Sequence, residues 1–336
     1  MPYTWNEQFL TSRTESAIDP ELPIIDPHHH LWDAPGLQPY LVPQLRDDTG
    51  AGHNIVGTVF IDCAWNYRTD GPTKLRPLGE TERAAAAAAE AAEAGDPPIG
   101  AIVSFVDMTL GSAAGDILDQ HLAIGAGKFR GIRHATAYST DPAIARSHTR
   151  PTPGIMRESS FHEGVRELAQ RGLTFDAWLY HQQIPELTEL ARAVPDCTIV
   201  LDHLGGPLGV GEFADRHEEV MTDWRAAMKD LAACQNVHVK LGGIGMPIFG
   251  GGFEKLSQAP TSDDLVAAWK GPIEGVIESF GVQRCMFESN FPVDRQSTNY
   301  VILWNAFKKM TADATPSERA ALFEGTARSV YQIADR

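Results

Sequence analysis

Three consecutive histidines follow a short apolar run near the start of the chain, in the sequence Asp-Pro-His-His-His-Leu-Trp over residues 26–32. Side chains alternate between the two faces of a strand, so Asp26, His28 and His30 are expected on one side. Two imidazoles spaced in this way make a suitable pair of ligands for a divalent metal. A solvated loop is the alternative interpretation, but the position directly after strand-like residues favours a site.

Two further histidines, His181 and His203, each come at the end of an apolar run. Either one alone is more typical of a core or loop position. If these runs are strands of one closed barrel, both imidazoles converge with the first pair at its open end. We place Tyr180, directly before His181, among the expected substrate-binding residues.

A carboxylate stands in the last apolar run, where Glu288 and Asn290 share a face. A buried carboxylate is costly unless it is paired, hydrogen-bonded or bound to a metal. Glu288 is therefore a metal ligand, a catalytic base or the structural partner of a buried cation, and the pattern alone leaves these three roles open.

Two cations lie on predicted strands. Arg133 has the two-pronged guanidinium that binds a substrate carboxylate well, or it forms a salt bridge between strands and helices. Only one of Arg133 and His134 can point inward. Lys240 has the same two interpretations, and both cations count as candidate substrate-binding residues.

Eight short apolar runs alternate with longer amphipathic stretches and would position these residues. The runs are rich in β-branched and aromatic residues, as is typical of buried parallel strands. They cover residues 23–27, 55–62, 99–106, 129–134, 173–180, 198–202, 237–242 and 285–288. Helices are predicted over residues 80–94, 160–170, 184–193, 216–233, 263–280 and 316–334. The alternation favours a (β/α)8 TIM barrel of the α/β class over a doubly wound sheet.

The chain shows no linker, so residues 1–336 are expected to form one domain with an N-terminal arm of about residues 1–22. The net charge of −16 at pH 7 disfavours nucleic acid and anionic membrane surfaces as partners, because both need clustered Lys and Arg. A small anionic substrate needs only a few local cations. No apolar run has the length of a signal peptide or membrane span, which predicts a cytoplasmic protein. A homo-oligomer is compatible with the sequence.

Together the motifs resemble the amidohydrolase superfamily, in the branch of TIM-barrel hydrolases that includes sugar-acid lactonases and 2-pyrone-4,6-dicarboxylate lactonase. The family's Asp-x-His-x-His-x-Trp matches residues 26–32, and its Asp-His-Leu-Gly-x-Pro matches residues 202–207. The motif Gly-Ser-Asp-Trp-Pro reads Glu-Ser-Asn-Phe-Pro over residues 288–292. Where relatives carry an aspartate that activates water, this chain carries Asn290, whose amide cannot act as a carboxylate base. Glu288 is first in line for that role.

The resemblance implies a hydrolase in which activated water cleaves a carboxylate-bearing lactone or other ester. A divalent metal (Zn, Mn or Fe) is expected, although the branch includes members that are thought to work without one. The expected metal ligands are His28, His30, His181, His203 and Glu288; the expected catalytic residues are Glu288, His203, His181 and Asn290. The competing hypotheses are a nonoxidative decarboxylase or metal-dependent oxygenase on the same barrel, and a noncatalytic ligand-binding barrel.

Overall fold

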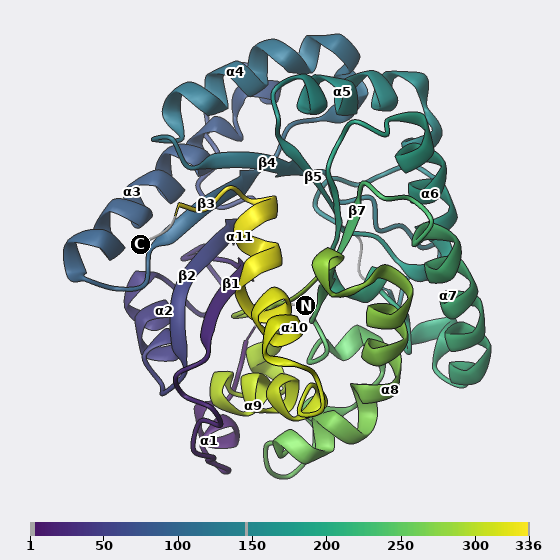
Figure 1. Cartoon of the computed structure of the whole chain (residues 1–336). Helices are drawn as coiled ribbons and strands as arrows, with labels where there is room; N and C mark the ends of the chain where they lie inside the picture. The colour runs from purple at the N-terminus through teal and green to yellow at the C-terminus, as the bar shows by residue number, and fades with distance from the viewer. Residues whose placement is uncertain (1–3, 145–146, 335–336) are drawn as a thin grey trace.

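All eight predicted apolar runs are strands of one barrel in the computed structural model, which describes residues 4–144 and 147–334 (Figure 1). The strands pair in chain order, and each neighbouring pair is parallel. They are β1 (Pro23–His29), β2 (Asn54–Ile61), β3 (Ile99–Ser104), β4 (Phe129–Arg133), β5 (Thr174–Ala177), β6 (Ile199–Leu201), β7 (Val237–Leu241) and β8 (Cys285–Phe287). The predicted (β/α)8 barrel is confirmed.

Backbone hydrogen bonds between the first and last strands close the ring. The Asn290 amide donates to the carbonyl of His28 at 3.0 Å, and the His30 amide donates to the carbonyl of Phe291 at 2.8 Å. Both bonds lie at the C-terminal ends of β1 and β8. Closure of the barrel therefore brings the first and last sequence motifs side by side.

Helices surround the strands, as Figure 1 shows. They are α2 (Val42–Thr49), α3 (Leu78–Ala94), α4 (Gly115–Ile124), α5 (Ser159–Gln170), α6 (Ile184–Ala193), α7 (His217–Leu231), α8 (Ser262–Phe280) and α9 (Tyr300–Met310), and the short α1 (Glu7–Leu10) lies in the predicted arm. The alanine-rich α3 buries Ala84, Ala87, Ala88 and Ala91, a helical spacing that turns one small-residue face inward. Residues 1–3 of the arm lie outside the described residues.

The single helix predicted over residues 316–334 contains a π-helical turn and ends earlier, at Val330. α10 (Pro316–Ala320) runs into a π-helical turn (Ala321–Gly325) and then α11 (Thr326–Val330), and the helix ends there. A π turn adds a residue to the helical repeat and so changes which side chains face the barrel. Tyr331, just past the helix, is completely buried.

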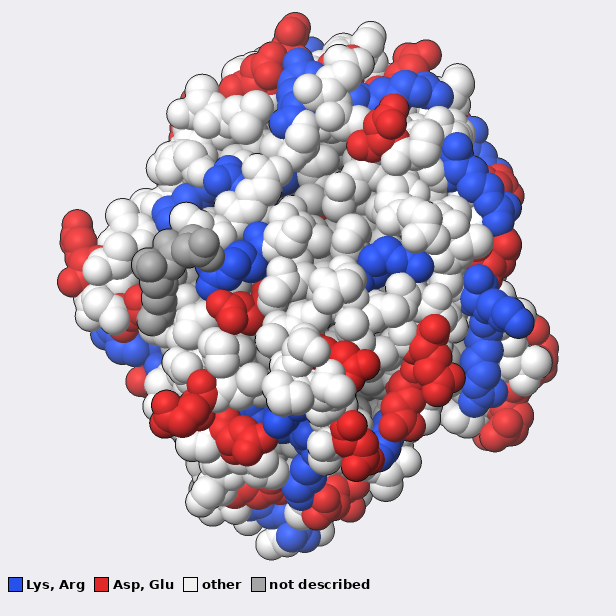
Figure 2. All heavy atoms as spheres, viewed as in Figure 1, with Lys and Arg blue, Asp and Glu red and all other residues white. Residues whose placement is uncertain are grey.

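Acidic and basic side chains are intermixed over the described part of the face in Figure 2. Among the helices of residues 4–144 and 147–334, none combines the length and the apolarity that crossing a bilayer requires.

Candidate active site

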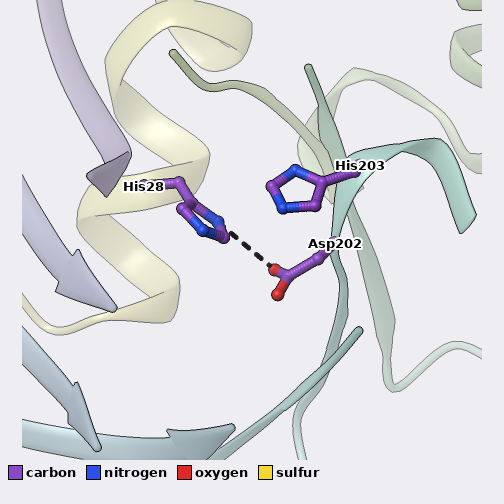
Figure 3. Close-up of side chains that lie close together, drawn as sticks. All are labelled: His28, Asp202 and His203. Atoms are coloured by element: carbon purple, nitrogen blue, oxygen red, sulfur yellow. Dashed lines mark ion pairs between the residues drawn. The ribbon is translucent and has the colours of Figure 1, made fainter. Parts of the chain in front are cut away.

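Three of the predicted histidines meet at the C-terminal end of the barrel. The Nε2 atoms of His28 and His30 are 3.2 Å apart, and the ring centroids of His28 and His203 are 4.5 Å apart. None of the three residues is more than 3% exposed. In Figure 3 the side chains of His28, His203 and Asp202 point toward one another from β1 and from the end of β6.

Glu288, the residue after β8, joins two of these imidazoles. Its Oε2 atom lies 2.8 Å from Nδ1 of His28, and its Oε1 atom lies 2.6 Å from Nδ1 of His203. Burial alone would raise the pKa of Glu288, but His203 and His28 outweigh it and lower the pKa to about 2. Glu288 is therefore a carboxylate whose Oε1 accepts a hydrogen bond from His203 and whose Oε2 faces His28 at ion-pair distance. A side chain at Gly242 would collide with Glu288, so this glycine makes room for it.

Two of the three imidazoles have partners that fix their tautomer. Nδ1 of His30 lies 2.9 Å from the carbonyl oxygen of Ile61, which can only accept, and Nδ1 of His203 lies 2.6 Å from Oε1 of Glu288, so both Nδ1 atoms carry a hydrogen. Nδ1 of His28 faces the Glu288 carboxylate at 2.8 Å and the Lys240 ammonium at 3.3 Å, so it carries the hydrogen when it bonds Glu288 and accepts when Lys240 donates to it. Burial, reinforced by Lys240 at His28 and by Arg133 at His30, holds the pKa of both imidazoles well below the ordinary value.

The pair of Nε2 atoms fits a metal ion. At 3.2 Å these two atoms share a hydrogen when one ring carries it on Nε2, and a metal ion can take the place of that hydrogen. Zinc–nitrogen bonds of 2.0–2.1 Å at a tetrahedral angle would separate two ligand nitrogens by about 3.3 Å. Among the described residues, His28, Asp202 and His203 also offer ligand atoms that lie within 4.8 Å of one another.

Lys240 lies beneath His28, completely buried. Its Nζ atom is 2.8 Å from Asp176, 3.0 Å from Asp202 and 3.3 Å from Nδ1 of His28. Burial lowers the pKa of Lys240, but the two aspartates outweigh it, so the net shift is upward and the side chain stays charged. The ammonium group is thus enclosed by carboxylates of the barrel interior.

Arg133 is 7% exposed and is held between two buried aspartates. Its guanidinium donates to the backbone carbonyl of Asp62 and lies 3.8 Å from Oδ2 of Asp202. Its Nη1 atom is 3.4 Å from Nε2 of His28. Both aspartates follow strands, β2 and β6, so these ion pairs connect strand ends and not strands and helices as the salt-bridge interpretation expected.

Asn290 is buried, with a backbone φ of 56°. Its side-chain amide donates to Oδ1 of Asp294 at 2.8 Å, and the Gly245 amide donates to Oδ2 at 2.8 Å. Burial raises the pKa of Asp294 to about 7. Asp294 is completely buried.

His181 contacts residues that follow β6, and the ring of Tyr180 lies 5.7 Å from that of Trp178. The chain leaves β5 at Ala177 and turns into a short 3-10 helix that begins at His181. The imidazole of His181 packs against Phe213 with ring centroids 5.2 Å apart and accepts from the Leu208 amide at 3.4 Å. A cavity of about 300 Å³ separates this ring from residues of α7. Tyr180 is 2% exposed.

Three buried aspartates of the site were missed as candidates: Asp62, Asp176 and Asp202. Asp202 was visible as the first residue of the Asp-His-Leu-Gly motif, but strict alternation would turn it away from its neighbour His203. His203 and Leu204 instead have φ values of 50° and 56°, so the strand geometry ends at Asp202. No comparable motif marked Asp62 or Asp176.

The model of the amidohydrolase family matches residues 25–333. The chain belongs to the amidohydrolase family. This amidohydrolase is 34% identical over 335 residues to an uncharacterized protein of Sinorhizobium fredii, covering 93% of this chain and 99% of the relative. It is 25% identical to an L-fucono-1,5-lactonase of Burkholderia multivorans, with 92% and 96% covered. The match confirms the family that the motifs predicted, and an enzyme of amidohydrolase type.

A solved structure has the same fold. A crystal structure of an amidohydrolase from Burkholderia multivorans with bound zinc superposes with a TM-score of 0.71 at 22% identity. The superposition covers 93% of this amidohydrolase and 99% of that chain.

The larger cavity of this amidohydrolase, about 570 Å³, adjoins the site through one histidine. His148 lines it, and its Nε2 atom lies 3.5 Å from Asp62, the partner of Arg133. Tyr138 and Arg150 also line this cavity. No sequence motif marks these residues, because they follow the end of β4 in a segment without regular structure.

Proposed function

We propose that this amidohydrolase binds one divalent metal ion on His28, His30 and His203 and hydrolyses a carboxylate-bearing lactone or ester. The observation that carries the proposal is the 3.2 Å distance between the Nε2 atoms of His28 and His30. Three imidazoles with an open fourth position are a ligand set found in catalytic zinc sites. The zinc in the related Burkholderia multivorans structure supports the choice of metal.

When bound, the metal would polarise a carbonyl group and lower the pKa of a water molecule from 15.7 to about 7. Glu288 keeps His28 and His203 in the tautomer that offers Nε2. Both of its oxygen atoms are engaged by imidazoles, so we assign it an orienting role in place of the ligand or base role that the sequence left open. We likewise leave His181 out of the ligand set, because its contacts lie toward α7.

Arg133 and Lys240 balance the buried aspartates. With Asp62, Asp176 and Asp202 ionised beneath the imidazoles, two cations reduce the negative charge that the metal would otherwise have to offset alone. We therefore propose that both cations position the site and that the substrate carboxylate binds elsewhere. His148 and Arg150 in the adjoining cavity are the basic side chains that fit the role of binding the substrate carboxylate.

In the proposed reaction the oxygen of water bonds to the acyl carbon, the ester C–O bond breaks, and the leaving alkoxide takes up a proton. The product is a hydroxy acid, which releases one proton to solvent near neutral pH. The L-fucono-1,5-lactonase relative supports a lactone as the substrate.

The test combines metal analysis with a proton-release screen on untagged protein. We expect one divalent metal per chain, and acid release from members of a panel of carboxylate-bearing lactones and esters. Chelation should abolish the release, and zinc should restore it. His30→Asn should lose both metal and activity, whereas His53→Asn, at a buried histidine bonded to Lys308, should keep both. Full activity in metal-free protein would contradict the proposal, and CO2 release without ester cleavage would favour a decarboxylase.

A further inference from the structure

The segment after α11 closes the end of the barrel opposite the active site. Gln332 donates to the carbonyl of Gly172, just before β5, and Ile333 packs over Gly100 at the start of β3. Tyr331 directly precedes these two residues and packs with apolar side chains of the barrel interior. In Figure 1, α11 lies in front of the ring of strands.

Tyr331 ends in a polar contact inside this apolar plug. Its hydroxyl donates to Oδ2 of Asp176 at 2.6 Å, and the same oxygen accepts from Lys240 at 2.8 Å. The other oxygen of Asp176 accepts from the Thr174 hydroxyl at 2.9 Å. The Lys240 ammonium also lies 5.4 Å from the centre of the Tyr331 ring. Tyr331 thus contacts both Asp176 and Lys240, the two members of this ion pair.

Lys240 connects Tyr331 and Asp176 to the active site. It lies 3.0 Å from Oδ1 of Asp202, and that oxygen is 3.6 Å from Nδ1 of His28. Asp202 and Glu288 are therefore both close to the same imidazole hydrogen. Because these groups are all buried, the effective dielectric is low and a small shift of the ammonium changes how strongly Asp202 competes.

We propose that Tyr331 is a positioning residue for the active site, acting through Asp176 and Lys240 on His28. Its hydroxyl bond satisfies part of the Asp176 charge, so Lys240 stays shared between Asp176 and Asp202. Without that bond, Asp176 draws Lys240 away, and Asp202 pulls the Nδ1 hydrogen of His28 away from Glu288. The proposal rests on the proposed function in one respect, that His28 is a metal ligand.

The chain offers a matched control for Tyr331→Phe. The Tyr40 hydroxyl donates to Asp48 at 2.7 Å, and Asp48 is paired with Arg295 at 2.7 Å. This triad has the same chemistry as Tyr331 with Asp176 and Lys240, but it lies beside the N-terminal arm. Tyr40→Phe therefore removes an equivalent buried hydrogen bond without touching the site.

The experiment measures thermal unfolding, zinc affinity by chelator competition, and the Nδ1 resonance of His28 in protein labelled with 15N-histidine. Both variants should lose similar stability. Only Tyr331→Phe should weaken zinc binding, by roughly three- to tenfold, less than the ten- to hundredfold typical of direct outer partners of metal ligands. Only Tyr331→Phe should shift the His28 resonance in metal-free protein.

Equal zinc affinities and equal His28 spectra in the two variants would overturn the proposal. If the wild-type protein binds no zinc, the proposed function fails, and the His28 resonance alone then decides the role of Tyr331. A shift in Tyr331→Phe alone would sustain the role, and an unshifted resonance would refute it.

Discussion

Replacing Glu288 with glutamine keeps the shape of the side chain and removes its charge. In the wild type, each carboxylate oxygen accepts the Nδ1 hydrogen of one imidazole, at 2.8 Å for His28 and 2.6 Å for His203. Glutamine offers one oxygen and one NH2 group, so one imidazole must face a donor. That ring can accept from the amide only by moving its hydrogen to Nε2, which removes its lone pair from the proposed metal site.

The size of the effect follows from this single lost contact. A hydrogen bond to a charged group contributes roughly 1.5–3 kcal/mol. Loss of an outer-shell partner of a metal ligand typically costs roughly ten- to hundredfold in affinity, and this corresponds to about 1.4–2.8 kcal/mol. The two ranges agree, so we expect Glu288→Gln to bind zinc ten to one hundred times more weakly than the wild type.

The assay is a competition titration with a chromophoric chelator at pH 7.5, accompanied by thermal unfolding of the metal-free proteins. Asp48→Asn is the matched control, because Asp48 is also a charge-paired carboxylate, 13% exposed, but is bonded to Arg295 and Tyr40. Both variants should be less stable than the wild type, and only Glu288→Gln should lose zinc affinity. A folded Glu288→Gln protein with zinc affinity within twofold of the wild type would refute the orienting role.

Two further predictions concern stability. Arg133→Met should lower the free energy of unfolding by about 3–5 kcal/mol, because the buried Asp62 loses its guanidinium partner and the buried Asp202 keeps only Lys240; Arg192→Met, at an exposed ion pair with Asp230, should cost no more than about 1 kcal/mol in the same denaturant titration. Burial lowers the pKa of His121 to about 3, so the folded state resists a proton that the unfolded chain takes up below about pH 6.5. Wild-type stability should therefore fall as the pH drops from 6.5 toward 3, and His121→Gln should remove up to about 1.4 kcal/mol of that loss per pH unit. Parallel stability curves from urea titrations at pH 7, 6, 5 and 4 would contradict this assignment.

The barrel could be predicted from the sequence because burial of both faces imposes a local pattern. Each strand of a parallel barrel is apolar throughout, and each is short, so the eight runs stood out from the amphipathic helices between them. The end of the chain could not be predicted in the same way. One helix was predicted through residues 316–334, and no residue pattern marked the π turn or the earlier end of α11.

Alternation along a strand predicted the direction of a side chain where the strand reaches that residue. It could not predict the direction where the strand ends before the residue. His28 lies within β1, and His30 directly follows it, so alternation placed both on the inner side. His181 lies four residues beyond the end of β5, where the chain has already turned toward α7.

The residues that follow β6 and β8 show the physical reason. His203 and Asn290 both have positive φ values, 50° and 56°, a conformation that disrupts the alternation on which the prediction depended. The turn at His203 keeps Asp202 and His203 on the same site, and the turn at Asn290 directs its amide to Asp294. Such backbone conformations persist only where the surrounding structure imposes them. At His203 the hydrogen bonds to Glu288 do so, and at Asn290 the backbone hydrogen bond to His28 does so. A pattern that is read residue by residue cannot contain these constraints, because they come from segments more than eighty positions apart in the chain.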